Sequence, residues 1–181
     1  MASELTVQTL RGPTSGANAD TVLIPSGQTL HAPGHVIQLQ ALSRVRTSTQ
    51  VLSSTSTVIL NDGVGNFETT ITPKFSNSKI VGYVNIAGIA SVSNANSIAF
   101  MIYRNGSFIQ TIDNHLGYNG DEHGDRHHLS HQFIDEPNST STVTYSIYVK
   151  PATTGSVIMF DNHVPTPSHP TNNLILQEIA Q

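Results

Sequence analysis

Alternation of apolar and polar residues with a period of two runs through this sequence, and almost no stretch shows the 3.6-residue period of a helix. Such alternation is typical of strands that bury one face. Gly, Pro and Asn interrupt the alternating stretches at short intervals and predict turns between them. About seven to nine short strands arranged in this way predict an all-β fold, an antiparallel β-sandwich of jelly-roll-like type.

Two stretches give the strongest predictions within this fold. Lys79–Val92 is long and apolar on both faces, as expected of a central strand. Asn105 and Gly106 separate two alternating stretches, and both residues tolerate the positive φ angles of a type I′ hairpin turn. Further strands are expected at Phe67–Ile71, Leu129–Ile134, Thr142–Lys150, Ser156–Phe160 and Asn173–Ile179.

The N-terminal part differs from the rest because it has too few apolar residues to build a core. Thr9–Gln38 holds a short strand, a turn and a flat alternating strand. We therefore expect residues 1–42 to form a docking or stalk segment and residues 43–181 to form a β-sandwich head. The apolar side chains of the segment need a neighbouring subunit to cover them, which predicts a homotrimer. The interface candidates are Leu23, Ile24, Leu30, Val36, Ile37 and Leu39.

Composition narrows the range of partners. Charged residues make up 11% of the chain and apolar residues 37%, against about 25% and about 45–50% in average soluble proteins. With a net charge of −4 and eight Lys and Arg, the chain lacks the clustered cations that nucleic-acid binding needs. No window reaches the ~20 apolar residues of a membrane span, and no secretory signal is visible. The absence of cysteine agrees with folding in a reducing cytoplasm.

The densest group of potential metal ligands lies in the segment from residue 115 to residue 131. Imidazole and carboxylate groups together suit zinc, nickel or iron. Gly120 and Gly124 argue against a helix here, and the HExxH motif is absent. On a strand, His127 and His131 would face one way and His128 the other. The candidate ligands are His123, His127, His128 and His131.

Two interpretations of these histidines remain open. Three copies of one histidine could meet on a trimer axis and hold a metal, or the segment could be a polar, partly exposed strand and loop. The second interpretation predicts no metal and no cofactor, and it is the one favoured by the spacing. The same histidines could instead sense pH, since imidazole titrates near neutrality. His31 and His35 flank a Pro-Gly pair and are expected to be turn or interface residues.

No motif in the sequence predicts catalysis. The GxSxG nucleophile motif is absent, and Asp62–Asn66 has the glycines of a phosphate loop without its Lys-Ser/Thr pair, which predicts a β-turn. The oxygen-rich segment Asp113–Asp125 lacks the spacing of an EF-hand. Asp121 and Glu122 lie in a glycine-rich loop, where carboxylates are more often solvated than paired as in a glycosidase. We therefore expect a protein without enzymatic activity.

Four parts of the sequence resemble tail-fibre-like and virion structural proteins of tailed bacteriophages, especially of cyanophages and other aquatic phages. They are TVLIPSGQTLHAPGHVIQ (residues 21–38), ITPKFSNSKIVGYVNIAG (Ile71–Gly88), the loop Gly120–Arg126 and the closing ILQEIA. The resemblance implies a trimeric surface protein of a phage virion, made in the bacterial cytoplasm and docked by its N-terminal segment with the β-domain outward. Family members are known mainly as particle components, and the resemblance brings no catalytic signature.

Three functional hypotheses follow, in decreasing order of support. The first is a structural protein of the particle, either a short tail or baseplate fibre or a capsid decoration or head fibre, with other virion proteins as partners. The second is a host receptor-binding module whose loops contact a glycan or an envelope protein. The third is a depolymerase of surface polysaccharide, although the chain lacks the repeated coils of a β-helix enzyme. The host-contact candidates are Tyr118, Asp121, Glu122 and Arg126.

Overall fold

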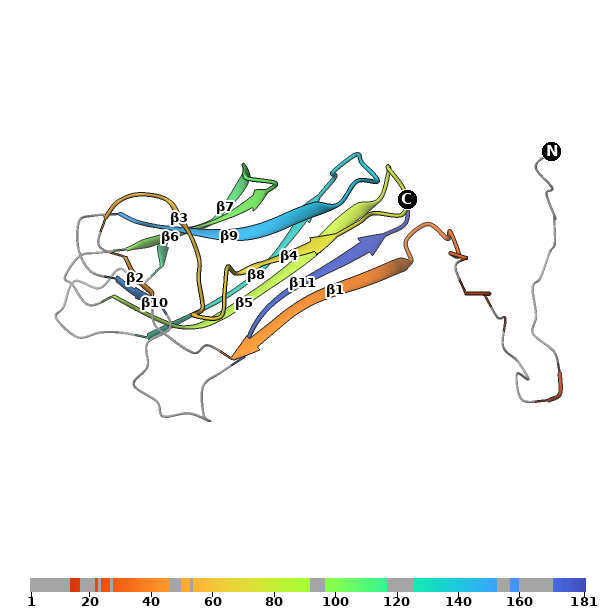
Figure 1. The fold of residues 1–181 in the computed structure, drawn as a ribbon, viewed down its shortest axis with the longest axis horizontal. Helices are drawn as coiled ribbons and strands as arrows, with labels where there is room; N and C mark the ends of the chain where they lie inside the picture. The colour runs from red at the N-terminus through yellow and green to blue at the C-terminus, as the bar shows by residue number, and fades with distance from the viewer. Residues whose placement is uncertain are drawn as a thin grey trace.

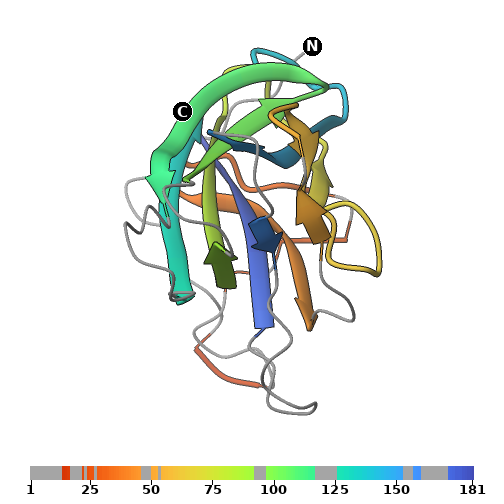
Figure 2. The ribbon, with the colours of Figure 1, turned by 90° about the vertical axis from the view of Figure 1, so that its left-hand side faces the viewer.

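The computed structural model shows an all-β molecule in which two antiparallel sheets pack face to face (Figure 1 and Figure 2). It describes residues 14–16, 22, 24–26, 28–45, 50–52, 54–91, 97–116, 126–152, 157–159 and 171–181. Every regular element in these residues is a strand, so they contain no helix that could cross a membrane. The predicted antiparallel β-sandwich is therefore confirmed.

The first sheet is built around a long central strand, as the sequence predicts. It comprises β1 (Val36–Val45), β2 (Gln50–Leu52), β5 (Lys79–Ser91), β8 (Arg126–Asp135), β10 (Val157–Met159) and β11 (Thr171–Ile179). β5 pairs with β8 along one side, and along the other side it pairs first with β11 and then with β10. β1 extends the sheet beyond β11, and β2 extends it beyond β10.

The second sheet covers the inner face of the first. It comprises β3 (Val58–Ile59), β4 (Glu68–Ile71), β6 (Ile98–Arg104), β7 (Ser107–Leu116) and β9 (Val143–Pro151). β9 lies between β6 and the two short strands β3 and β4, and β7 forms the other edge. Most strands expected from the sequence occur within a few residues of their predicted positions.

Alternation along the strands directs one set of side chains into the space between the sheets. On β11, Asn172, Leu174, Leu176 and Glu178 are buried, whereas the residues between them are partly exposed. The apolar members of this inner set form one continuous core. The largest fully buried side chains are Leu60, Phe67, Ile71, Ile80, Ile86, Ile89, Ile98, Phe100, Ile102, Tyr145 and Ile147.

A polar network also links the two sheets. Arg104 Nη1 on β6 donates a hydrogen bond to Asp135 Oδ2 on β8 at 2.7 Å. The hydroxyl of Tyr145 on β9 donates to the same carboxylate oxygen at 2.6 Å. Burial of the phenol, together with its hydrogen bond to Asp135, raises the pKa of Tyr145 well above its ordinary value. The hydroxyl therefore stays protonated and continues to donate to Asp135 across the neutral pH range.

The turn between β6 and β7 is the predicted hairpin turn. Asn105 and Gly106 have φ angles of 49° and 77°, so both central residues occupy the region that a type I′ turn requires. The turn is also held by the neighbouring strand, because Asn105 N donates to Thr144 O at 2.9 Å and Thr144 N donates to Asn105 Oδ1 at 2.8 Å.

Replacing Gly106 by alanine is expected to lower the free energy of unfolding by about 1 kcal/mol, because a side chain resists positive φ. A Cβ atom at this position would meet nothing within 4 Å, so the cost is backbone strain alone. Denaturant melts followed by circular dichroism measure the loss. Gly106→Asn is the matched control and should lose less, since asparagine tolerates this region. Equal losses in the two variants would argue against strain as the cause.

Asp62–Asn66 forms the predicted turn. Asp62 N donates to Gly65 O at 3.2 Å, and Asp62 Oδ1 accepts hydrogen bonds from Val64 N and Gly65 N at 3.0 and 3.1 Å. Arg44 Nη1 on β1 lies 3.5 Å from the same oxygen. Asp62 thus stabilises the turn and also its contact with Arg44 of β1.

The expected boundary between the N-terminal segment and the head needs correction. That boundary, between residues 42 and 43, falls inside β1, which pairs with β11 from Val36 to Val45. The sandwich therefore begins at Val36. Local composition hides this, because the partner of β1 lies at the other end of the chain and strand stability depends on such neighbours.

Candidate functional site

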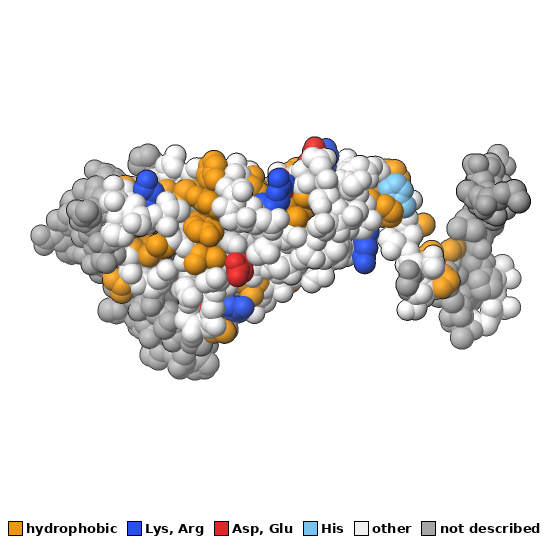
Figure 3. Space-filling view, turned by 45° about the horizontal axis from the view of Figure 1, so that its top comes forward, with side chains coloured by type: hydrophobic (Ala, Val, Ile, Leu, Met, Phe, Trp, Pro, Cys, Tyr) orange, Lys and Arg blue, Asp and Glu red, His pale blue; other side chains and the backbone are white. Residues whose placement is uncertain are grey.

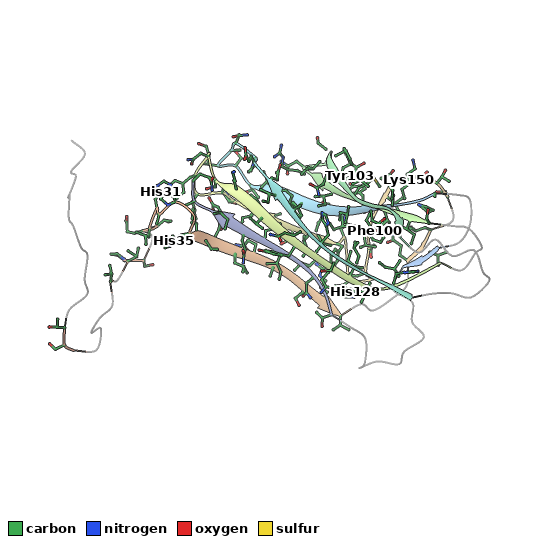
Figure 4. All side chains as sticks on the ribbon, turned by 180° about the vertical axis from the view of Figure 1, so that it is seen from behind. His31, His35, Phe100, Tyr103, His128 and Lys150 are labelled. Atoms are coloured by element: carbon green, nitrogen blue, oxygen red, sulfur yellow. The ribbon has the colours of Figure 1, made fainter. Side chains whose placement is uncertain are left out.

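The histidines of β8 alternate between the two sides of the sheet, as the sequence predicts. His127 and His131 lie on the inner side with the buried Leu129, whereas His128 is exposed on the outer face (Figure 4). His131 Nε2 lies 3.0 Å from Nε2 of Gln110 on β7. Nε2 of His127 is buried and has no hydrogen-bond partner among the described residues.

These histidines do not form a metal site within the described part of the chain. No three His, Asp or Glu side chains gather closely enough there to hold an ion. Figure 4 also shows His31 and His35 well away from His128 along the sandwich. His123 lies outside the described residues, so a metal site on a trimer axis stays a hypothesis.

The segment expected to contact a host connects β7 to β8. Tyr118, Asp121 and Glu122 lie outside the described residues. Arg126 is the first residue of β8, where it pairs with Ala90 of β5. The role of these four residues in host contact stays a prediction.

The N-terminal segment leaves the sandwich beside the C-terminus (Figure 1). Gly34 N donates to Ala180 O at 2.8 Å, and Ala180 N donates to His35 O at 2.9 Å. His31 Nε2 lies 3.1 Å from Gln181 O. His31 and His35 thus belong to a turn and its contacts, in agreement with the sequence, and they fix the point at which the segment departs.

Large apolar side chains are exposed along this segment and at the start of β1. Exposed fractions lie between 43 and 55% at Val22, Ile24, Leu30, Val36 and Leu39. Ile37 is partly buried, and Leu23 lies outside the described residues. Val36, Ile37 and Leu39 were expected in a separate segment, but they belong to β1 and hence to the sandwich itself.

A hollow of about 540 Å³ lies on the outer face of the first sheet. Six outward-facing residues on three neighbouring strands line it in two cross-strand rows. The first row is Asn173 on β11, Asn85 on β5 and Ser130 on β8, the second row is Ile175, Tyr83 and Gln132 on the same strands, and Val84 and His131 lie between the rows. We call this set the sheet hollow.

The lining of the sheet hollow can form hydrogen bonds but carries no charged side chain among its described residues. Amide and hydroxyl groups each offer both donors and acceptors. Tyr83 is 38% exposed and adds an aromatic ring. Asn85 Oδ1 is buried without a hydrogen-bond partner among the described residues, a state that costs about 1–3 kcal/mol. A concave site with a few convergent polar groups is the usual form of a small-ligand site.

An aromatic cluster lies on the outer face of the second sheet. The ring of Tyr103 on β6 lies 4.1 Å from that of Tyr148 on β9 and 5.8 Å from that of Phe108 on β7, measured between centroids. Phe108 is 53% exposed. Figure 3 shows apolar side chains gathered on the side of the molecule that carries β7 and β9, with isolated charges among them. This apolar character suits a contact surface more than a small-ligand site.

Sequence reasoning missed both the sheet hollow and the aromatic cluster. Their residues come from strands that are distant in the chain, and the pairing that joins them is not visible in local patterns. One signal was present, because Asn85 and Tyr83 occupy alternate positions of a strand predicted to be buried on both faces. Polar or aromatic residues at such positions indicate that this face of the strand is not packed in the core and is available for contacts with a ligand.

No protein-family model and no curated protein matches the sequence. Among solved structures, the chain is similar to part of dimeric latent PorU from Porphyromonas gingivalis, at 9% identity and a TM-score of 0.41, covering 90% of this chain and 15% of that one. A VP2 mutant of infectious bursal disease virus shows 11% identity and a TM-score of 0.46, covering 93% and 44%. A VP2 subviral particle of the same virus shows 10% identity and a TM-score of 0.45, covering 93% and 46%.

This chain thus spans between 15 and 46% of the length of these three structures. None of them is a tailed-phage fibre protein. At these identities and TM-scores the likeness carries no information on function.

Proposed function

We propose that this chain is a non-enzymatic structural protein on the surface of a phage particle, where its N-terminal segment forms a homotrimer and docks to other virion proteins. The exposed apolar side chains that lead into β1 carry this proposal. Burying each of them against another protein contributes about 1.5–3 kcal/mol, so an isolated chain leaves this stabilisation unused. The sequence resemblance to phage structural proteins supplies the setting.

The place where the N-terminal segment leaves the sandwich determines which end of the molecule would face the particle. Hydrogen bonds of Gly34 and His35 to Ala180 tie the segment to the end of the sandwich where the C-terminus lies (Figure 1). A chain held at that end presents the faces of both sheets and the opposite end to the surroundings. This arrangement suits a short fibre or a capsid decoration whose β-domain points outward.

Deletion of residues 1–30 is expected to turn a trimer into a monomer without unfolding the sandwich. The variant keeps β1 and the hydrogen bonds to Ala180, so its core is unchanged. Light scattering should give about three times 19.4 kDa for the full chain and a single subunit mass for the variant. The variant should still melt in one cooperative transition, and only the full chain should sediment with particles. A monomeric full chain would refute the trimer.

A pair of point variants sharpens this test. Leu30→Ser removes an exposed apolar side chain from the segment, and Val64→Ser removes one from a turn elsewhere on the surface. Since Leu30 and Val64 are 55% and 59% exposed, both changes should leave the fold intact. Only Leu30→Ser should weaken the trimer. Equal behaviour of the two variants would show that exposure alone, rather than position, governs association.

A further inference from the structure

The geometry points to the sheet hollow as a binding site for an uncharged oligosaccharide. The hollow spans three strands and two rows, which corresponds to a footprint of about 10 Å by 7 Å at ordinary strand and residue spacings. Its volume of about 540 Å³ lies within the range of small-ligand sites. This inference concerns the sandwich alone and does not depend on the docking role of the N-terminal segment.

The functional groups of the hollow match the chemistry of sugar hydroxyls. A hydroxyl both donates and accepts, and it is best met by groups that do the same. Asn173, Asn85 and Gln132 supply amides, and Ser130 supplies a hydroxyl. The amide oxygen of Asn85 is buried and has no hydrogen-bond partner among the described residues, so a ligand hydroxyl would remove this penalty only by drawing the Asn85 side chain toward the hollow.

The second row supplies the apolar part of the contact. Tyr83 presents a ring that is 38% exposed, with Ile175 beside it on the neighbouring strand. The phenol group combines an apolar body with a polar tip, and such side chains are favoured where a ligand has both characters. A sugar ring also has both characters, because C–H groups form its faces and hydroxyls its rim.

The absence of charge selects among saccharides. No Asp, Glu, Lys or Arg is among the described residues that line the hollow, and the nearest titratable side chain on this face of β8 is His128. Acidic sugars gain affinity from cationic side chains, which this lining does not offer. The same reasoning disfavours a nucleic acid. A protein partner would need roughly 800 Å² of contact, far more than the hollow provides.

The test uses the full chain with maltotriose, mannotriose and chitotriose as neutral probes and a trisaccharide of galacturonic acid as the acidic probe. Backbone amide NMR spectra are recorded during titration to millimolar concentration. We expect at least one neutral probe to shift resonances of β5, β8 and β11, and the acidic probe to bind at least about tenfold more weakly. If no neutral probe binds, or if the acidic probe binds as well, the inference is wrong.

Variants locate the site. Tyr83→Ala should lower the affinity for the neutral probe about tenfold, since an aromatic contact of about 1.4 kcal/mol corresponds to that factor. Gln132→Ala changes an exposed side chain and should weaken binding without affecting the melt. Tyr103→Ala, on the outer face of the other sheet, is the matched control and should bind normally. Weakening by Tyr103→Ala alone would move the site to the aromatic cluster and overturn the assignment.

The saccharide-binding experiment and the trimer experiment can fail independently of each other. Deletion of residues 1–30 leaves β5, β8 and β11 intact, so the truncated protein should bind the saccharide as the full chain does. Failure of the saccharide to bind either protein would reject the hollow as a glycan site. That result would leave the trimer prediction standing.

Discussion

Gly82→Ala is expected to lower the free energy of unfolding by about 3 kcal/mol, because the added methyl group would collide with a buried aromatic ring. Gly82 lies on the inner face of the central strand β5, directly across from Phe133 of β8. A Cβ atom at this position would overlap Cε1, Cζ and Cδ1 of the Phe133 ring, all within 3.0 Å. The ring cannot easily move aside, because it is buried and its centroid lies 5.6 Å from that of Tyr145.

A double variant tests this cause. Phe133→Leu alone should cost about 1–2 kcal/mol through lost packing. Combined with Gly82→Ala it should cost less than the sum by about 1–3 kcal/mol, because the added methyl group then occupies space that the ring has left. Gly65→Ala is a control that meets only the end of the Arg44 side chain, at 3.4 Å. Denaturant melts measure all four, and strict additivity would show that the ring is not the obstacle.

The strands themselves could be predicted because their signals are local. The apolar run predicted at Lys79–Val92 matches β5, and the predicted Asn105-Gly106 turn matches the β6–β7 hairpin, because each signal depends only on residues within a few positions. Alternation also placed His127 and His131 on one side of β8 and His128 on the other. Such features follow from the period of a strand and from the φ preferences of a turn.

The remaining features depend on pairing across the chain. β1 was recognised as a strand but assigned to a separate segment, because its partner β11 lies about 140 residues later. The need for glycine at position 82 arises from Phe133, and the sheet hollow arises from the register of β5 with both β8 and β11. A single sequence gives the alternation of each strand, but it does not give which strand lies beside it or in which register.

The two proposed contact regions use different parts of the same sheet. The docking region includes the start of β1, next to the C-terminus, whereas the sheet hollow lies over the middle of β5 and its neighbours. Tyr83 and Leu39 are separated by β11, so a variant in one region leaves the other unchanged. A protein held at one end could therefore bind a saccharide on its exposed sheet face, which joins the first two hypotheses from the sequence.

Glu178→Leu is expected to lower the free energy of unfolding by about 4 kcal/mol, although leucine has a suitable volume for a buried site. Glu178 is fully buried on β11, and four donors converge on its carboxylate. Oε1 accepts hydrogen bonds from Lys74 N at 2.7 Å, Phe75 N at 3.2 Å and Ser78 Oγ at 2.7 Å. Oε2 accepts from Gln38 Nε2 at 2.6 Å. Leucine would leave all four donors without this acceptor.

Glu178→Gln separates the loss of charge from the loss of acceptors. The glutamine can keep one oxygen toward the 74–78 turn, but its amide nitrogen then faces the amide nitrogen of Gln38. Gln38 cannot relieve this contact between two donors by flipping its amide group, because its nitrogen also donates to Thr72 O at 2.6 Å. We therefore expect Glu178→Gln to lower the free energy of unfolding by about 2 kcal/mol, which places its stability between those of wild type and Glu178→Leu.

Glu136→Gln serves as the exposed control for both substitutions at Glu178. Its carboxylate lies 3.3 Å from Lys79 Nζ, and the two side chains are 59% and 41% exposed. An exposed ion pair contributes about 0–1 kcal/mol, so this variant should melt close to wild type in denaturant at neutral pH. Glu178→Leu could also melt at a denaturant concentration close to that of wild type. In that case the donors of the 74–78 turn must find other acceptors, and the carboxylate would not be what joins that turn to β1 and β11.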